Sequence, residues 1–227
     1  MSDPSVREPK ILVTEGPYIV SGGVPIVRRR KVVSENDEPM TWQTTAHLPT
    51  QDEAYLCRCG GSSTKPFCDD THLRNGFDGP QTASTEPYAE RAKPMDGGGV
   101  VVRDDRSLCA HAGFCSNKAT NVWKIARGEG AADSVARSAM IAMIEHCPSG
   151  ALSFRLTEST PDVEPALAVM IGVVDDGPLL VTGGIPVTRE DGTTDGVRNR
   201  MALCRCGQSA NKPYCDGTHA KVGFVDS

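Results

Sequence analysis

Residues 57–72 read CRCGGSSTKPFCDDTH, and residues 204–219 read CRCGQSANKPYCDGTH. Eleven of these sixteen positions are identical, including three cysteines and one histidine in each copy. Upstream, residues 16–28 (GPYIVSGGVPIVR) match residues 177–189 (GPLLVTGGIPVTR) at seven of thirteen positions. The first copy has 14 extra residues between its two blocks. They fall in the polar stretch Val33–Glu53, which we expect to be a loop. The chain is therefore predicted to contain two repeats with an insert between them.

Each repeat presents four candidate metal ligands in the pattern C-x-C-x8-C-x3-H. They are Cys57, Cys59, Cys68 and His72 in the first repeat, and Cys204, Cys206, Cys215 and His219 in the second. Residues four apart share one face of a helix, so the last cysteine and the histidine are expected to meet on a first helical turn. Asp69 and Asp216 can cap that turn. Structural zinc sites usually pair their ligands as C-x2–4-C, so the spacing leaves both zinc and an iron–sulfur cluster open.

Composition excludes several classes of protein. Glycine (23) and proline (16) are frequent and aromatic residues make up only 5%, which is incompatible with a helical bundle or coiled coil. Nine cysteines cannot all form disulfides, and the N-terminus lacks a secretory signal, so we expect a cytoplasmic chain with reduced thiols. The longest apolar run, Ala166–Val174, is too short to cross a membrane. A net charge of −5 with no basic stripe does not indicate nucleic-acid binding.

Short strands are expected around the Gly-Gly turns of both repeats, and one good helix is expected in the insert. The strands are predicted at Tyr18–Val20, Ile26–Val27, Leu179–Val181, Ile185–Val187 and Ala168–Val174. The helix is predicted at Asp133–His146, with an apolar stripe formed by Val135, Met140, Met143 and Ile144. Val100–Val102 and the segment around Phe154 and Leu156 should add strands to the insert. We therefore predict three units, 1–98, 99–160 and 161–227.

The repeats resemble the CDGSH iron–sulfur domain of the mitoNEET family. The pattern CRCG–S–KP-[FY]-CD-x-TH, preceded by GP-x-x-V-x-GG-x-P, carries the resemblance over most of both repeats. The resemblance implies one [2Fe–2S] cluster per repeat. Two cysteines would hold one iron (Cys57 and Cys59, or Cys204 and Cys206), and a cysteine and a histidine the other (Cys68 and His72, or Cys215 and His219). The first repeat departs from the pattern at Asp70, where the second has Gly217.

The same resemblance implies a fold. Family members form two-fold dimers in which strands of both halves build a β-rich cap, and two repeats in one chain can build that dimer internally, leaving a monomer. The expected class is thus α+β: a β-rich pseudo-two-fold unit with a small ferredoxin-like insert. The alternative is two independent beads.

The insert contains Cys109, Cys115 and, 32 residues further on, Cys147 followed by proline. This arrangement resembles the divergent single-cluster ferredoxins, in which C-x2-C-x2-C and a distant Cys-Pro hold one cluster. Ala112 stands where the second cysteine would be, and His111 is adjacent to that vacancy. The resemblance implies a [3Fe–4S] cluster or a [4Fe–4S] cluster with histidine as a ligand. The alternative is three unconnected cysteines in a small packed domain.

Three functions follow as hypotheses. The first is an electron carrier with three iron–sulfur centres and a partner oxidoreductase. The second is a cluster donor to an apo-acceptor, or a redox or pH sensor. The third is a zinc-stapled scaffold. The sequence contains no phosphate loop, nucleophile elbow or dinucleotide fingerprint, so we do not expect an enzyme.

Overall fold

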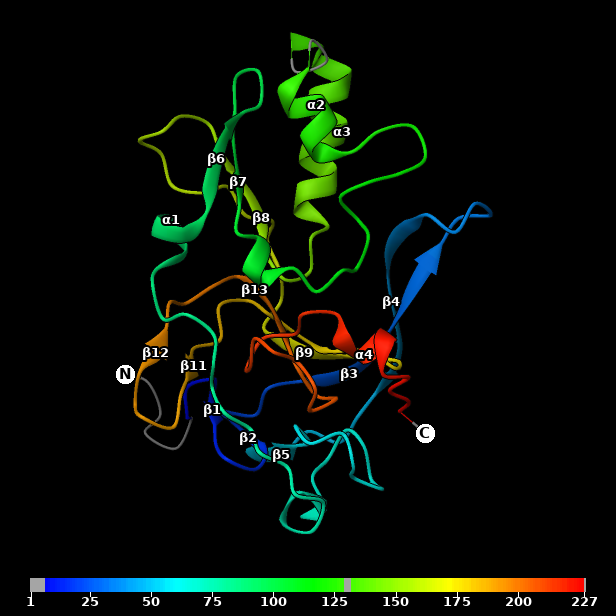
Figure 1. Cartoon of the computed structure of the whole chain (residues 1–227), viewed down its shortest axis with the longest axis vertical. Helices are drawn as coiled ribbons and strands as arrows, with labels where there is room; N and C mark the ends of the chain where they lie inside the picture. The colour runs from blue at the N-terminus through cyan, green and yellow to red at the C-terminus, as the bar shows by residue number, and fades with distance from the viewer. Residues whose placement is uncertain (1–6, 129–131, 227) are drawn as a thin grey trace.

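The computed structural model describes residues 7–128 and 132–226, and Figure 1 shows their arrangement. The described residues are rich in strands and poor in helices, in agreement with the expected α+β class. Their strands form two sheets of five strands and one sheet of three. None of the described helices is long and apolar enough to span a membrane.

The first large sheet combines strands of both repeats in the order β12-β11-β1-β2-β5. The first repeat supplies β1 (Lys10–Val13), β2 (Tyr18–Ser21) and β5 (Glu53–Leu56). The second repeat supplies β11 (Val187–Thr188) and β12 (Thr194–Asp195). The two sets meet where β1 runs parallel to β11, with Ile11 opposite Val187.

The second large sheet reverses the contributions, in the order β13-β10-β9-β3-β4. The second repeat supplies β9 (Met170–Val174), β10 (Leu179–Thr182) and β13 (Arg200–Leu203). The first repeat supplies β3 (Ile26–Val33) and β4 (Pro39–His47). Here β3 runs parallel to β9, with Ile26 opposite Ile171. Each repeat therefore gives strands to both sheets, and one hydrophobic core contains Ile11, Val20, Ile171 and Val181 together.

The insert forms the upper part of the molecule in Figure 1, and its Leu108 and Ala151 pack into the core shared by the two repeats. Its sheet has the order β6-β7-β8, from β6 (Lys93–Asp96), β7 (Val101–Asp104) and β8 (Leu152–Arg155). Its helices are α2 (Val122–Arg127) and α3 (Ser134–Glu145), and α1 (Tyr88–Arg91) precedes the sheet. The carboxylate of Asp133 caps α3 by accepting hydrogen bonds from the N–H groups of Val135 and Ala136, at 2.7 and 3.0 Å.

Parts of the expected secondary structure were wrong. The stretch Val33–Glu53 is not a loop, because β4 lies within it and pairs with β3. Its side chains are almost all exposed, so hydrophobic periodicity carries no signal for this hairpin. In α3, Met140 and Ile144 are buried as expected, but Val135 is 77% exposed. Strand β11 begins at Val187, and Ile185 is buried before it.

Candidate metal centres

The first candidate centre lies in the loop that follows β5, residues 57–72. Cys57 comes directly after the strand, and its Sγ lies 3.7 Å from the Sγ of Cys59, with both side chains buried. Further along the loop, the Sγ of Cys68 lies 3.5 Å from Nδ1 of His72. The four ligand residues expected in this repeat therefore come together as two pairs.

The second candidate centre, residues 204–219, repeats this construction after β13. The Sγ atoms of Cys204 and Cys206 are 3.7 Å apart, and the Sγ of Cys215 is 3.3 Å from Nδ1 of His219. All nine cysteines lie in the described part of the chain, and all are free thiols. Both sets of donors are thus available for a metal.

The pair distances can be tested against metal geometry. Two ligands of one tetrahedral metal, with bonds of about 2.3 Å to sulfur and about 2.0 Å to nitrogen, lie about 3.8 Å apart as S···S and about 3.5 Å apart as S···N. Each observed pair matches one of these values. Among the described residues, only Cys68, Asp70 and His72 form a set of three such donors within 4.8 Å of one another. The two pairs of a loop therefore do not converge on a single point.

The local fold brings cysteine and histidine together differently from what we expected. The third cysteine lies outside the helix in each loop, since the 3₁₀ helix η1 (Thr71–Leu73) begins at Thr71 and α4 (Thr218–Lys221) begins at Thr218. A residue in the left-handed region connects cysteine and helix in each loop, Asp70 at φ 62° and Gly217 at φ 82°. This turn, rather than a shared helical face, brings the histidine to the cysteine.

Aspartates hold both turns in shape. Asp69 accepts hydrogen bonds from the backbone N–H groups of Ser63 at 2.8 Å and Thr71 at 3.1 Å. Asp216 accepts the equivalent bonds from Ala210 at 2.9 Å and Thr218 at 3.0 Å. Each carboxylate therefore ties the start of its helix back to the middle of its loop, which extends the predicted capping role.

A third candidate centre lies in the insert. Cys109, Cys115 and Cys147 line one cavity of about 200 Å³, so the predicted ligands do come together. Cys109 follows the short helix η2 (Arg106–Leu108), and Cys147 follows α3. A guanidinium nitrogen of Arg106 lies 3.9 Å from the Sγ of Cys109. Burial raises the pKa of Cys115, and the neighbouring Cys147 and Cys109 side chains raise it further.

Comparisons with known families agree with these three centres. The family described as iron-binding zinc finger, CDGSH type, matches residues 15–73 and 176–220. The chain contains two CDGSH domains. Between them, residues 95–157 match the divergent 4Fe–4S mono-cluster family. No curated protein and no solved structure matches the chain.

The thiols of each CDGSH loop differ in pKa. The hydrogen bond with the partner thiol, together with burial, raises the pKa of Cys57 and Cys206, and burial raises the pKa of Cys68 and Cys215. The hydrogen bond between the paired thiols lowers the pKa of Cys59 in the first loop and of Cys204 in the second, because it stabilises the thiolate. Burial lowers the pKa of His219, and the positive charge of Arg205 lowers it further. A thiolate and a neutral imidazole are the forms that bind metal, so the lowered pKa values favour metal binding at Cys59, Cys204 and His219, whereas the other thiols of the loops must lose a proton when a metal binds.

The arginine of each C-R-C motif was missed by the sequence reasoning. Arg205 is buried and donates hydrogen bonds to the carbonyls of Gly177 (2.7 Å) and Val174 (2.5 Å) and to the carboxylate of Asp226 (2.7 Å). Arg58 likewise bonds the carbonyls of Thr14 and Gly79. These bonds fix the CDGSH loop to the sheet behind it. The sequence did hold a sign of this role, because an arginine stands between the two candidate cysteine ligands in both repeats.

Tyr18 was also missed as a site residue. Its buried hydroxyl lies in the first repeat but donates to the carbonyl of Cys204, 2.7 Å away, and lies 3.1 Å from the carbonyl of Pro213. The first repeat therefore helps to position a candidate ligand of the second. Its counterpart at the equivalent position of the second repeat is Leu179, which has no hydroxyl, so alignment of the repeats gave no signal.

Proposed function

We propose that the chain is an electron carrier with one [2Fe–2S] cluster in each CDGSH loop and one [3Fe–4S] or [4Fe–4S] cluster in the insert. The observation that carries the proposal is the division of each CDGSH ligand set into two pairs, each spaced for its own tetrahedral metal. A closed single-zinc site would need all four donors within about 4 Å of one another. The pairs thus favour two iron positions per loop over a zinc staple.

When bound, such clusters supply reversible one-electron chemistry, and the protein tunes it through ligands, hydrogen bonds and burial. Backbone N–H groups of Gly61, Asp70 and Gly217 lie 3.4 Å from the sulfurs of Cys59, Cys68 and Cys215. These donors stabilise negative charge at the ligands, which is what one-electron reduction adds. A carrier of this kind would act between partner oxidoreductases and need no substrate site of its own.

We also propose that the two CDGSH domains are related by an internal pseudo-two-fold axis and that the chain acts as a monomer. The parallel junction of β1 with β11 has its counterpart in the junction of β9 with β3. These reciprocal junctions support the proposal, since a two-fold contact pairs the same patches in both directions. The nine free thiols support a reducing compartment such as the cytoplasm.

The decisive experiment is elemental analysis with EPR on anaerobically purified protein. Two [2Fe–2S] clusters and one [3Fe–4S] cluster give about seven irons and about eight sulfides per chain, and a [4Fe–4S] cluster gives about eight irons. Reversible reduction without loss of iron is expected from a carrier. Two or three zinc ions per chain without labile sulfide would overturn the proposal.

A cluster donor is the second candidate, and the first CDGSH loop favours it. Cys68 is half-buried and Asp70 is exposed there, so this centre lies close to the surface. Incubation of the loaded protein with an apo-ferredoxin separates the two functions. Stoichiometric transfer of iron and sulfide to the acceptor indicates a donor, whereas retention through repeated redox cycles indicates a carrier.

A further inference from the structure

The three-cysteine cavity of the insert, which we call the middle site, lies against the second CDGSH loop. A Cβ atom added to Gly217 would lie 2.8 Å from the Cδ2 atom of His111 and 3.1 Å from its Cβ. His111 itself has a φ of 56° and stands two residues after Cys109 in the chain. The imidazole of His111 therefore packs directly on Gly217, the middle one of the three residues between Cys215 and His219.

The middle site shares part of its wall with a neighbouring cavity that reaches the second CDGSH loop. Ala110, His111, Ala112 and Pro148 line the middle site, and the same four residues line a neighbouring cavity of about 480 Å³. His219 lines that second cavity. A single layer of residues thus separates the middle site from the space in front of a ligand of the second CDGSH loop.

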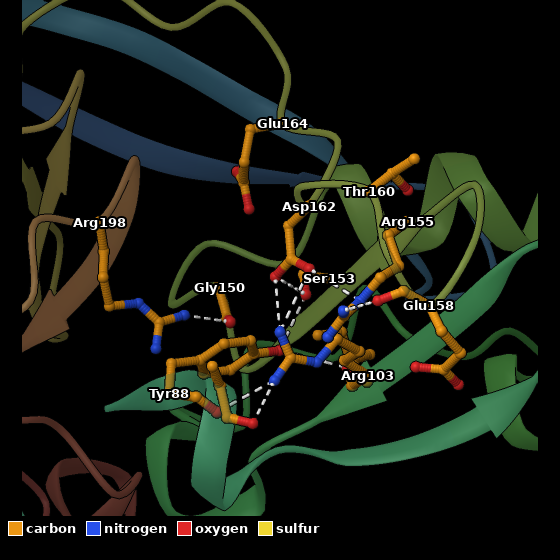
Figure 2. Close-up of polar contacts among 12 residues, drawn as sticks. Tyr88, Arg103, Gly150, Ser153, Arg155, Glu158, Thr160, Asp162, Glu164 and Arg198 are labelled. Carbon is orange, nitrogen blue, oxygen red and sulfur yellow. Dashed lines mark hydrogen bonds and ion pairs between the residues drawn. The ribbon is translucent and has the colours of Figure 1, made fainter. Parts of the chain in front are cut away.

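Strand β13 links the two sites, by a hydrogen bond at one end and by the chain itself at the other. It begins at Arg200, whose side chain is 2% exposed and donates to the carbonyl of Cys147 at 2.9 Å. It ends at Leu203, directly before Cys204. Figure 2 shows the neighbouring Arg198 pointing at the carbonyl of Gly150, which lies in the same turn as Cys147.

The second CDGSH loop also contacts the insert directly. The side-chain amide of Asn211 donates to the carbonyl of Ser107 at 2.7 Å, two residues before Cys109. The insert meets the first repeat through the β3–β4 hairpin instead, where the Trp42 and Phe114 rings are 5.4 Å apart and Lys31 Nζ lies 3.3 Å from the carbonyl of Ala112. These contacts involve the hairpin and not the first CDGSH loop.

One sequence difference between the two CDGSH loops matches their different contacts with the insert. Asp70 and Gly217 occupy equivalent positions and both have positive φ, but Asp70 is exposed and Gly217 is buried. Glycine is required where the imidazole of His111 approaches, since a side chain there would collide with it. In the first loop the equivalent position is exposed to solvent, so an aspartate side chain fits there.

The first CDGSH loop has its own contact with the second. Cys59 and Cys206 pair as an isolated antiparallel β-bridge. The three sites therefore form a series in which the second CDGSH loop touches both of the others.

We propose that electrons pass between the middle site and the first CDGSH site by way of the second CDGSH site, across the contact of His111 with Gly217. The proposal rests on the proposed electron-carrier function. In each step one electron leaves a reduced site and enters an oxidised one, with no bond made or broken. A one-electron carrier protein supplies the first electron and another accepts the last. His111 acts here as a positioning residue.

The test uses loaded protein and two variants that each lack one CDGSH cluster, Cys57→Ala for the first and Cys204→Ala for the second. Each is reduced with substoichiometric dithionite, which delivers single electrons through its SO2 radical anion, and rapidly frozen at increasing times for EPR. We expect the middle and second clusters of Cys57→Ala to equilibrate as fast as in the parent. In Cys204→Ala, we expect fast exchange between the middle and first clusters to be lost.

Magnetic coupling provides a readout that is independent of rate. Spin relaxation of the reduced second cluster should be enhanced by the middle cluster in Cys57→Ala, and relaxation of the reduced first cluster should show no such enhancement in Cys204→Ala. His111→Asn, which tolerates positive φ, should slow exchange between the middle and second clusters and leave all three EPR signals present. His47→Asn, on the exposed strand β4, is the matched control and should leave exchange unchanged.

The outcomes separate this inference from the proposed function. Protein without clusters, or with clusters that do not reduce reversibly, contradicts the electron-carrier function itself. Intact clusters with equally fast exchange in Cys204→Ala and the parent overturn the series. Loss of the middle EPR signal in His111→Asn would assign His111 as a cluster ligand and overturn its positioning role.

Discussion

Cys59 and Cys206 lie opposite each other in an antiparallel β-bridge that joins the two CDGSH loops. The glycines that follow them are packed reciprocally. A Cβ atom on Gly60 would lie 2.7 Å from the carbonyl oxygen of Cys206, and one on Gly207 would lie 2.7 Å from that of Cys59. Each loop thus presents backbone to the other at van der Waals distance, and each glycine is required by the opposite cysteine.

We expect Gly207→Ala to destabilise both clusters, although it changes only one loop. The substitution combines the strain of positive φ, about 1–2 kcal/mol, with a collision against backbone. The expected total loss in the free energy of unfolding is about 3 kcal/mol or more. Gly223→Ala is the control, because Gly223 also has positive φ (64°) but no atom lies within 4 Å of its added Cβ. Thermal bleaching of the visible absorption measures both variants, and equal melting temperatures would contradict the packing argument.

Tyr18→Phe should weaken the second CDGSH centre from within the first repeat. The substitution removes the hydroxyl that donates to the buried carbonyl of Cys204, and an unsatisfied buried acceptor costs about 1–3 kcal/mol. The exposed Tyr55, whose hydroxyl bonds only Glu53 among the hydrogen bonds described, provides the matched Tyr55→Phe control. We would compare urea unfolding and the rate of cluster loss in single-cluster proteins. An effect on the first cluster alone would contradict the cross-repeat contact.

Asp226→Asn should loosen the C-R-C motif of the second loop. The Asp226 side chain is 4% exposed and pairs with Arg205 and Arg28, so its loss leaves a buried guanidinium without its counter-ion. Breaking such a pair costs about 3 kcal/mol or more. Asp78→Asn, at an exposed position, should be close to neutral. Guanidinium unfolding at pH 7 measures the difference, and similar midpoints for the two variants would show that carbonyl contacts suffice for Arg205.

Mild acid should bleach the first CDGSH cluster before the second. Protons compete with metal for the imidazole ligand, and a free histidine titrates at about pH 6.5. Burial, with Arg205, lowers the pKa of His219, so its neutral form persists to lower pH than this reference. Cys215 is also buried whereas Cys68 is half-buried, which limits the access of water to the second centre.

The acid experiment follows visible absorption from pH 8 to pH 5 in variants that keep a single CDGSH cluster. His219→Cys replaces the imidazole for which protons compete with the metal. The substitution should therefore protect the second cluster further, while lowering its reduction potential. Bleaching of this variant at the parent's pH and rate would mean that histidine protonation is not the weak step. Bleaching of the second cluster before the first would contradict the role of burial.

The sequence predicted the pairing of the candidate ligands well because those of each CDGSH loop lie within sixteen residues. Cys57, Cys59, Cys68 and His72 come together in their expected pairs, and the second loop repeats them. The hairpin strand β4 was not predicted, because its exposed side chains show no apolar alternation. The shared helical face expected for Cys68 and His72 was also wrong, because the left-handed backbone at Asp70 is what turns the chain and brings His72 to Cys68.

The sequence by itself determined the two repeats, the candidate ligand sets and the families, because metal chemistry demands particular residue types at short, fixed spacings. Only the tertiary structure decided how these units meet. Strands β3 and β11 join the sheet of the opposite repeat, Cys59 faces Cys206, and His111 packs on Gly217 rather than on Asp70. Two nearly identical loops offer the insert the same local pattern. The choice between them depends on close packing of segments more than 100 residues apart, which no short-range pattern encodes.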